Sequence, residues 1–316
     1  MRKIEYGDVL RHAWAITWNN KLFWWLGFFV AIGSGFNGYS YDSGKSDKAP
    51  DAAMLFMQNH PTLFFVTVAA VIVIGIILYV LSVISSAALT LAVNDPVVYT
   101  QSKISKLLAT GKKFFWKLFA IDVVFGLALL GIAIVLIVPT ALLFYLKSYI
   151  LGSFAVVCAL AIIVPVLVLG HFMRKYAAFY VVLSNMKFRE AIEFSYTLFT
   201  GSIKESILAV LLSVGISILI SISFLAIILF AGVILFLIGL LLNLLIGNTG
   251  VIAIVCIGIL LLLGSIAILS GAYQTFFFSY WVCFYKEIAA NKGNEEKEIA
   301  SEKEISLQQS GSPEAA

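Results

Sequence analysis

The sequence predicts an all-α, polytopic membrane helix bundle with about six transmembrane helices. We expect three parallel repeats, each an amphipathic elbow helix followed by a hairpin. The first observation behind this prediction is composition: 61% of the 316 residues are hydrophobic and 12% are charged, whereas a soluble domain carries about 25% charged residues. No water-soluble fold can hide so much apolar surface, so the expected solvent is a bilayer. The other two observations are the long apolar runs and the charged segments that interrupt them.

The first unit begins with residues 4–18, where charged and apolar residues alternate at helical spacing. This pattern suits a helix that lies at the membrane surface. The apolar run over 22–36 is the first spanning candidate, and the polar residues over 37–60 are expected to form a loop. The second span covers 61–93, and small residues near its end would let neighbouring helices approach closely.

The second unit starts with an interruption over 94–113. Its two spans cover 114–146 and 150–169, and a single lysine, Lys147, marks the tight connection between them. The elbow over 171–205 then opens the third unit.

The third unit contains an apolar run over 206–246, which as one helix would rise ~60 Å, twice the hydrocarbon thickness. We therefore expect one long tilted helix with an irregular or interfacial end. The last span runs from Val251 to the aromatic cluster before Lys286.

The predicted domain organisation is simple. A single transmembrane domain covers 1–290, with repeats near 1–96, 97–184 and 185–290. Residues 291–316 are charged and polar and are expected to form a solvated cytoplasmic tail that is disordered or transiently helical.

Basic residues predict the orientation. With six spans, only Lys45, Lys48 and Lys147 of the 21 Lys and Arg residues fall on one side of the membrane, and the other 18 fall on the opposite side. The positive-inside rule then places both termini and all three interruptions in the cytoplasm. The expected location is the inner (cytoplasmic) membrane.

An internal repeat links the three interruptions. Shifting the chain by 98 or by 182 residues brings the same kind of helix face into register, with a small residue at one position. Units that return to the same side are parallel repeats about an axis along the membrane normal. The matched sets are Tyr6, Ile104 and Phe188; Val9, Leu107 and Ala191; Leu10, Leu108 and Ile192; Ala13, Gly111 and Ser195; and Ile16, Phe114 and Leu198.

Three stretches resemble a known group of proteins: RKYAAFYVVLSNMKFREAIEFSYTLF, AWAITWNNKLFWWLG and FFFSYWVCFYKEI. They are similar to uncharacterised bacterial six-span proteins related to the membrane domain of some glycerophosphodiester phosphodiesterases. In that pattern, aromatics end a span and an Ala-Ile-x-x-Ser helix follows, which Ala191, Ile192 and Ser195 match. The catalytic barrel of those enzymes is absent from this sequence, so the resemblance implies architecture and no hydrolysis.

Two polar residues near or within spans are candidates for function. Asp122 is the acidic residue well inside a span, and such acids are functional candidates by default. It could instead form an ion pair with Lys117 or Arg174. His171 lies at the predicted cytoplasmic end of the fourth span and suits an interface histidine.

Basic and aromatic residues beside the spans are candidate headgroup contacts, because each basic residue near an anionic leaflet contributes about 1 kcal/mol. They could equally serve only to set topology. Their setting beside a span favours lipid over nucleic acid as the partner. The candidates are Lys112, Lys113, Trp116, Lys117, Arg174, Lys175, Lys187 and Arg189.

Function is constrained mainly by chemistry that the sequence lacks. No motif for hydrolytic or phosphoryl chemistry is present, and no metal or other cofactor is expected. The prediction is a non-catalytic scaffold or lipid-interacting membrane protein, not an enzyme. The alternative is a small-molecule or ion transporter or channel, which would need a polar path at mid-membrane.

Overall fold

The computed structural model describes residues 5–35, 54, 57–99, 102–246 and 248–310. Within these residues the regular elements are helices and no strand occurs. The loop predicted over 37–60 lies mostly outside the described residues. The elements are α1 (Tyr6–Asn19), α2 (Phe23–Gly35), α4 (Pro61–Asn94), α5 (Pro96–Tyr99), α6 (Ile104–Lys112), α7 (Phe115–Tyr145), α8 (Tyr149–Leu183), α9 (Phe188–Gly201), α10 (Ile203–Ile246) and α11 (Asn248–Ser310).

Five of these helices, α4, α7, α8, α10 and α11, contain segments long and apolar enough to cross a membrane. The prediction of an all-α polytopic membrane protein is therefore confirmed. The remaining expected span, which is the first in the chain, corresponds to α2, an apolar helix of 13 described residues. At 1.5 Å per residue it rises only about 20 Å, less than the ~30 Å hydrocarbon core.

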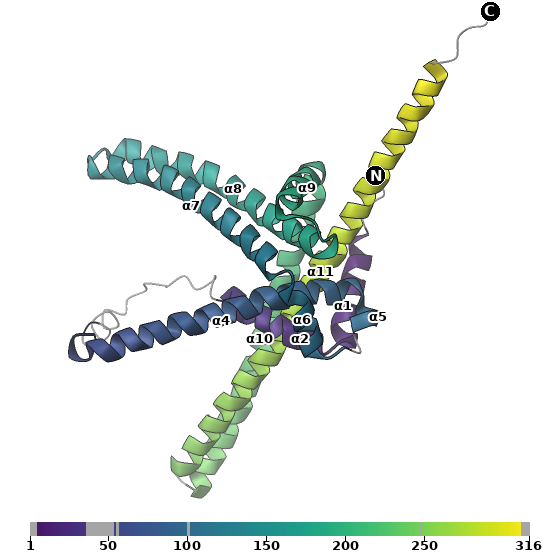
Figure 1. The fold of residues 1–316 in the computed structure, drawn as a ribbon. Helices are drawn as coiled ribbons and strands as arrows, with labels where there is room; N and C mark the ends of the chain where they lie inside the picture. The colour runs from purple at the N-terminus through teal and green to yellow at the C-terminus, as the bar shows by residue number, and fades with distance from the viewer. Residues whose placement is uncertain (1–4, 36–53, 55–56, 100–101, 247, 311–316) are drawn as a thin grey trace, which may run out of the picture.

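The long helices diverge from a common region that we call the hub (Figure 1). In the hub, the C-terminal parts of α4 and α8 and the middle of α11 are buried against one another and against the short helices α1, α6 and α9. From it, α4, the α7–α8 hairpin and the α10–α11 hairpin extend in three directions as separate arms (Figure 1). The buried residues of α4, α8 and α11 in the hub lie within 83–93, 172–182 and 271–288, and α7 and α10 add Leu118, Ile121, Ser206 and Ala209.

Outside the hub the arms expose apolar side chains on nearly every face, as at Val71 and Ile72 of α4 and Leu127 of α7. A helix that is apolar all round needs an apolar surrounding, which lipid supplies. The arms are therefore the membrane-spanning parts of the molecule, and the hub is where protein packs against protein.

The third unit differs from its prediction at two places. Helix α10 is one continuous helix of 44 residues, so the irregular end expected near residue 246 is absent. Continuous apolar sequence without Pro keeps its backbone hydrogen bonds internal, as a lipid environment requires. Helix α11 continues to Ser310, whereas a disordered or only transiently helical tail was expected from residue 291. The Glu-, Lys- and Ala-rich composition there favours helix.

Glycines bring helices into backbone contact at the hub. A Cβ at Gly111 of α6 would collide with the carbonyl oxygen of Ile84 on α4. A Cβ at Gly27 of α2 would likewise collide with the carbonyl oxygen of Gly271 on α11, and one at Gly271 with that of Trp24. At these places only a residue without a side chain permits the observed approach.

Candidate functional site

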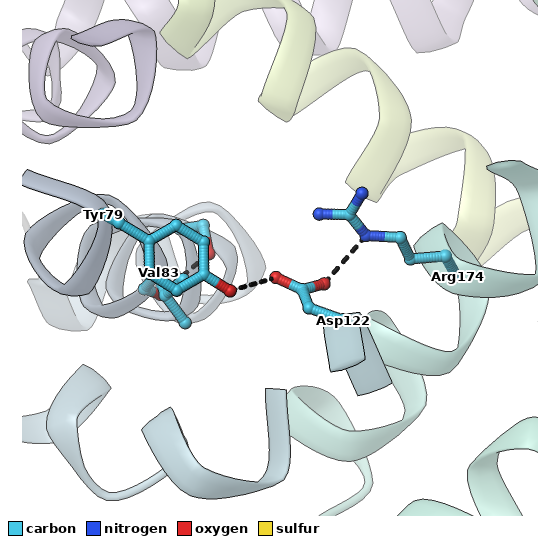
Figure 2. Close-up of polar contacts among 5 residues, drawn as sticks. Tyr79, Val83, Asp122 and Arg174 are labelled. Atoms are coloured by element: carbon cyan, nitrogen blue, oxygen red, sulfur yellow. Dashed lines mark hydrogen bonds and ion pairs between the residues drawn. The ribbon is translucent and has the colours of Figure 1, made fainter. Parts of the chain in front are cut away.

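A polar cluster joins three helices at the point where two arms separate. Asp122 of α7 accepts a hydrogen bond from Nε of Arg174 on α8 at 2.8 Å, which is also an ion pair. Its second carboxylate oxygen accepts a hydrogen bond from the Tyr79 hydroxyl of α4 at 3.0 Å. Figure 2 shows the carboxylate between the two partners. Asp122 is thus an ion-paired acid, and of the two partners considered from the sequence the structure selects Arg174.

The cluster lies at the outer edge of a small apolar core made by the same three helices. Val83 of α4, Ile121 of α7 and Ala177 of α8 are buried in that core. Tyr79 lies one turn beyond Val83, and Arg174 lies about one turn beyond Ala177. Beyond the cluster α4 and the α7–α8 hairpin diverge, so it marks the base of the fork between them (Figure 1).

Two predicted headgroup lysines have neutral partners inside the protein. Lys117 Nζ donates to Asn185 Oδ1 at 2.8 Å, and so ties the start of α7 to the connection between α8 and α9. Lys175 Nζ lies 3.7 Å from the ring centroid of Trp281, which is only 4% exposed. Trp281 is therefore a core residue of the hub, and its indole stabilises the ammonium through a cation–π interaction.

The other predicted headgroup residues are on the surface but do not form one patch. Lys112, Lys113 and Trp116 are exposed around the connection from α6 to α7, and Trp116 has 74% of its surface accessible. Lys187 and Arg189 are exposed at the start of α9. His171 is also exposed, and its ring meets that of Phe172 edge-on, with centroids 6.1 Å apart.

Hydroxyl groups that the sequence did not single out connect the hub helices. Tyr176 and Ser206 share a hydrogen bond of 2.8 Å between α8 and α10. The Tyr280 hydroxyl of α11 donates to the carbonyl oxygen of Ala209 on α10 at 3.0 Å. Thr275 of α11 donates to the carbonyl oxygen of Phe23 on α2 at 2.9 Å. Their signal in the sequence is weak, because a Tyr or Thr in an apolar run also occurs in lipid-facing helices.

Tyr6 of α1 adds a contact to the start of α10, where its hydroxyl lies 3.5 Å from the Glu205 carbonyl oxygen. Burial, and then the negative charge of Glu205, raise the pKa of the Tyr6 hydroxyl. The phenol therefore stays protonated and acts as a hydrogen-bond donor at neutral pH.

In the part of the chain that the structure describes, no group of three or more His, Cys, Asp or Glu side chains could hold a metal ion. A model described as a family of unknown function, DUF7544, matches residues 17–291. No curated protein and no solved structure matches the chain.

Proposed function

We propose that this chain, which belongs to the DUF7544 family of unknown function, is a non-catalytic, lipid-interacting scaffold of the inner (cytoplasmic) membrane. The observation that carries the proposal is the hub, where protein packing is concentrated while the arms present apolar side chains outward. Such an arrangement holds three membrane-crossing arms in fixed directions.

The resemblance to membrane domains of glycerophosphodiester phosphodiesterases stays a prediction.

A threefold internal repeat underlies the proposed scaffold. Helices α1, α6 and α9 begin at Tyr6, Ile104 and Phe188, the three residues that coincide under shifts of 98 and 182. The residues before α6 and α9 share one backbone conformation, with φ −67° and ψ 146° at Lys103 and φ −69° and ψ 150° at Lys187. The residue before α1 differs, with φ −88° and ψ 86° at Glu5. The equal starting points therefore support three related units, and the shared entry geometry supports the second and third.

Burial along the three short helices agrees with the same register. Val9, Leu107 and Ala191 are buried, and so are the small residues Ala13, Gly111 and Ser195 that follow them by four positions. Each short helix therefore presents the matching face to the hub. This supports an amphipathic elbow at the start of each unit.

The elbows also share a packing partner. Helix α6 packs against α4, and α9 packs against α8, so each elbow meets the second long helix of the preceding unit. Helix α1 packs against α11, the second long helix of the last unit. The pattern is cyclic, and a cyclic order of units is what a repeat about an axis along the membrane normal requires.

We further propose that the hub and both termini face the cytoplasm, because the basic residues gather on the hub side. Cysteine labelling tests this in a variant whose three native cysteines are replaced. Lys103→Cys and Arg189→Cys, both at exposed positions of the elbows, should react with an impermeant maleimide only after the membrane is opened. Lys147→Cys, exposed in the distal connection, should react in intact cells. Labelling of position 103 or 189 in intact cells contradicts the proposed orientation.

The scaffold proposal is tested by reconstitution. Because Asp122 is already paired with Arg174, we expect proteoliposomes to show no proton-driven uptake or ion flux above that of empty vesicles. Flux that Asp122→Asn abolishes would instead establish the alternative, a transporter or channel.

A further inference from the structure

We propose that Arg174 binds the phosphate group of an anionic phospholipid at the base of the fork between α4 and the α7–α8 hairpin. The guanidinium contacts Asp122 only through Nε, at 2.8 Å. Figure 2 shows the dashed line from the carboxylate ending at Nε, with no dashed line drawn to either terminal nitrogen. Within the described residues no hydrogen bond reaches them, so the end-on edge of the guanidinium presents two parallel donors. That edge fits two oxygens of a phosphate.

The depth of Arg174 in the bilayer follows from the far end of the hairpin. The exposed connection between α7 and α8 contains Tyr145, Lys147 and Tyr149, residue types that suit the distal interface. A helix needs about 20 residues to cross ~30 Å of hydrocarbon. Measured from this connection toward the hub, that length ends near residue 125 on α7 and near residue 169 on α8. Asp122 and Arg174 lie roughly one turn beyond these points. That position is the headgroup layer, where phosphates are.

The exposed Trp116 agrees with this depth. It lies six positions before Asp122 on α7, about 9 Å along the helix axis. Indole rings prefer the membrane interface, so the cluster lies on the hydrocarbon side of an interface residue but still within reach of headgroups.

Charge favours an anionic lipid over a zwitterionic one. The Arg174–Asp122 pair is the one salt bridge among the described residues, and it is neutral overall. At the start of α7, Lys117 is bound by the neutral amide of Asn185, so its positive charge is not cancelled by an acid. Lys112 and Lys113 are exposed just before this helix. The end of α7 nearest the cluster therefore carries an excess of positive charge. A choline or ethanolamine group would meet like charge there, whereas a phosphatidylglycerol headgroup would not.

Asp122 is the positioning residue in this arrangement. Its bond to Nε fixes the plane of the guanidinium, and Tyr79 in turn holds the carboxylate at 3.0 Å. A side chain with 53% of its surface exposed is otherwise free to move, so the ion pair removes most of the entropy that headgroup binding would cost.

The test uses the full chain in phosphatidylcholine nanodiscs that contain phosphatidylglycerol, with retained lipid counted by native mass spectrometry. We expect Arg174→Gln to lower phosphatidylglycerol retention about tenfold, the loss of one charge-assisted contact pair. Asp122→Asn/Arg174→Gln should show the same loss while leaving no charge unpaired, which separates lost binding from misfolding. Arg11→Gln removes an equal charge from the exposed face of α1, where no headgroup contact is predicted, and should retain lipid as the wild type does.

Equal retention by the Arg174→Gln and Arg11→Gln variants would overturn the proposal. So would displacement of the lipid by inorganic phosphate at comparable concentration, since the site would then take the free anion. The proposal rests on the proposed lipid-interacting function, but the failure of one can be told from the failure of the other. Lipid phosphates occur in both leaflets, so cysteine labelling can refute the cytoplasmic position of the hub while the retention of phosphatidylglycerol at Arg174 is unchanged.

Discussion

Replacing Gly111 by alanine tests whether the elbow helices pack on the long helices by backbone contact. A Cβ at this position would collide with the carbonyl oxygen of Ile84 and would lie 3.0 Å from the amide nitrogen and 3.1 Å from the Cβ of Ala88. These obstacles are backbone atoms or a methyl group, and none can rotate away. Helices α6 and α4 would have to separate by up to roughly 1 Å to restore ordinary contact distances.

Two opposing terms set the size of the effect. Overpacking in a well-packed core costs about 1–3 kcal/mol. Replacing Gly by Ala within a helix raises the free energy of unfolding by about 1 kcal/mol, because Ala has the higher helix propensity. The Gly111→Ala variant should therefore be destabilised by up to about 2 kcal/mol.

Gly7→Ala is the matched control, because Gly7 also lies in an elbow helix but has open space where its Cβ would be. It should be neutral or stabilised by up to about 1 kcal/mol. The difference between the two variants isolates the overpacking term. It can be measured by reversible unfolding in mixed micelles, followed through tryptophan fluorescence, with the buried Trp281 as a reporter of the hub. If both variants unfold at the same denaturant concentration, the close approach of α6 to α4 is wrong.

Two further substitutions test other hub contacts in the same unfolding assay. Gly271→Ala should lower the free energy of unfolding by up to about 2 kcal/mol, the same balance as at Gly111, because α11 meets the backbone of α2 there. Gly264→Ala on the exposed part of α11 should not lower it, and equal stability of the two variants would refute the α2–α11 contact. Asp122→Asn should lower the free energy of unfolding by about 1 kcal/mol, a value kept small because the ion pair is partly exposed. Adding Arg174→Gln should recover part of that free energy. Strictly additive effects of the two substitutions would show that the side chains do not interact.

The sequence predicted the elements well because their signals are local. The stripe that starts at Tyr6, Ile104 and Phe188 coincides with the starts of three helices. The apolar runs from residue 61 onward fall on the long helices, but α8 continues to Leu183, through residues that were expected to belong to the elbow. Packing faces were not predictable, since the spans are apolar on every side. Val83 is buried and Val71 is exposed in the same helix, and residue type does not distinguish them.

The pairing of Asp122 could have been derived from the sequence. Residues 122 and 174 lie equally far, 26 positions, from Ser148 at the tight connection, so an antiparallel hairpin places them opposite one another. Lys117, the other partner considered, is opposite residue 179 instead. The buried place of Trp281 had no such signal, because it depends on how the third hairpin meets α8, a contact between distant parts of the chain.

The packing of α1 against α11 has a consequence for biosynthesis. Helix α1 is synthesised long before α11, yet it buries Val9 and Ala13 in the cluster that α11 helps to form. Until α11 has been made, that apolar face lacks this partner and must rest on the membrane surface. Chains that stop before α11 should therefore keep the first helix accessible to added protease, and protection should appear only when the final hairpin has inserted.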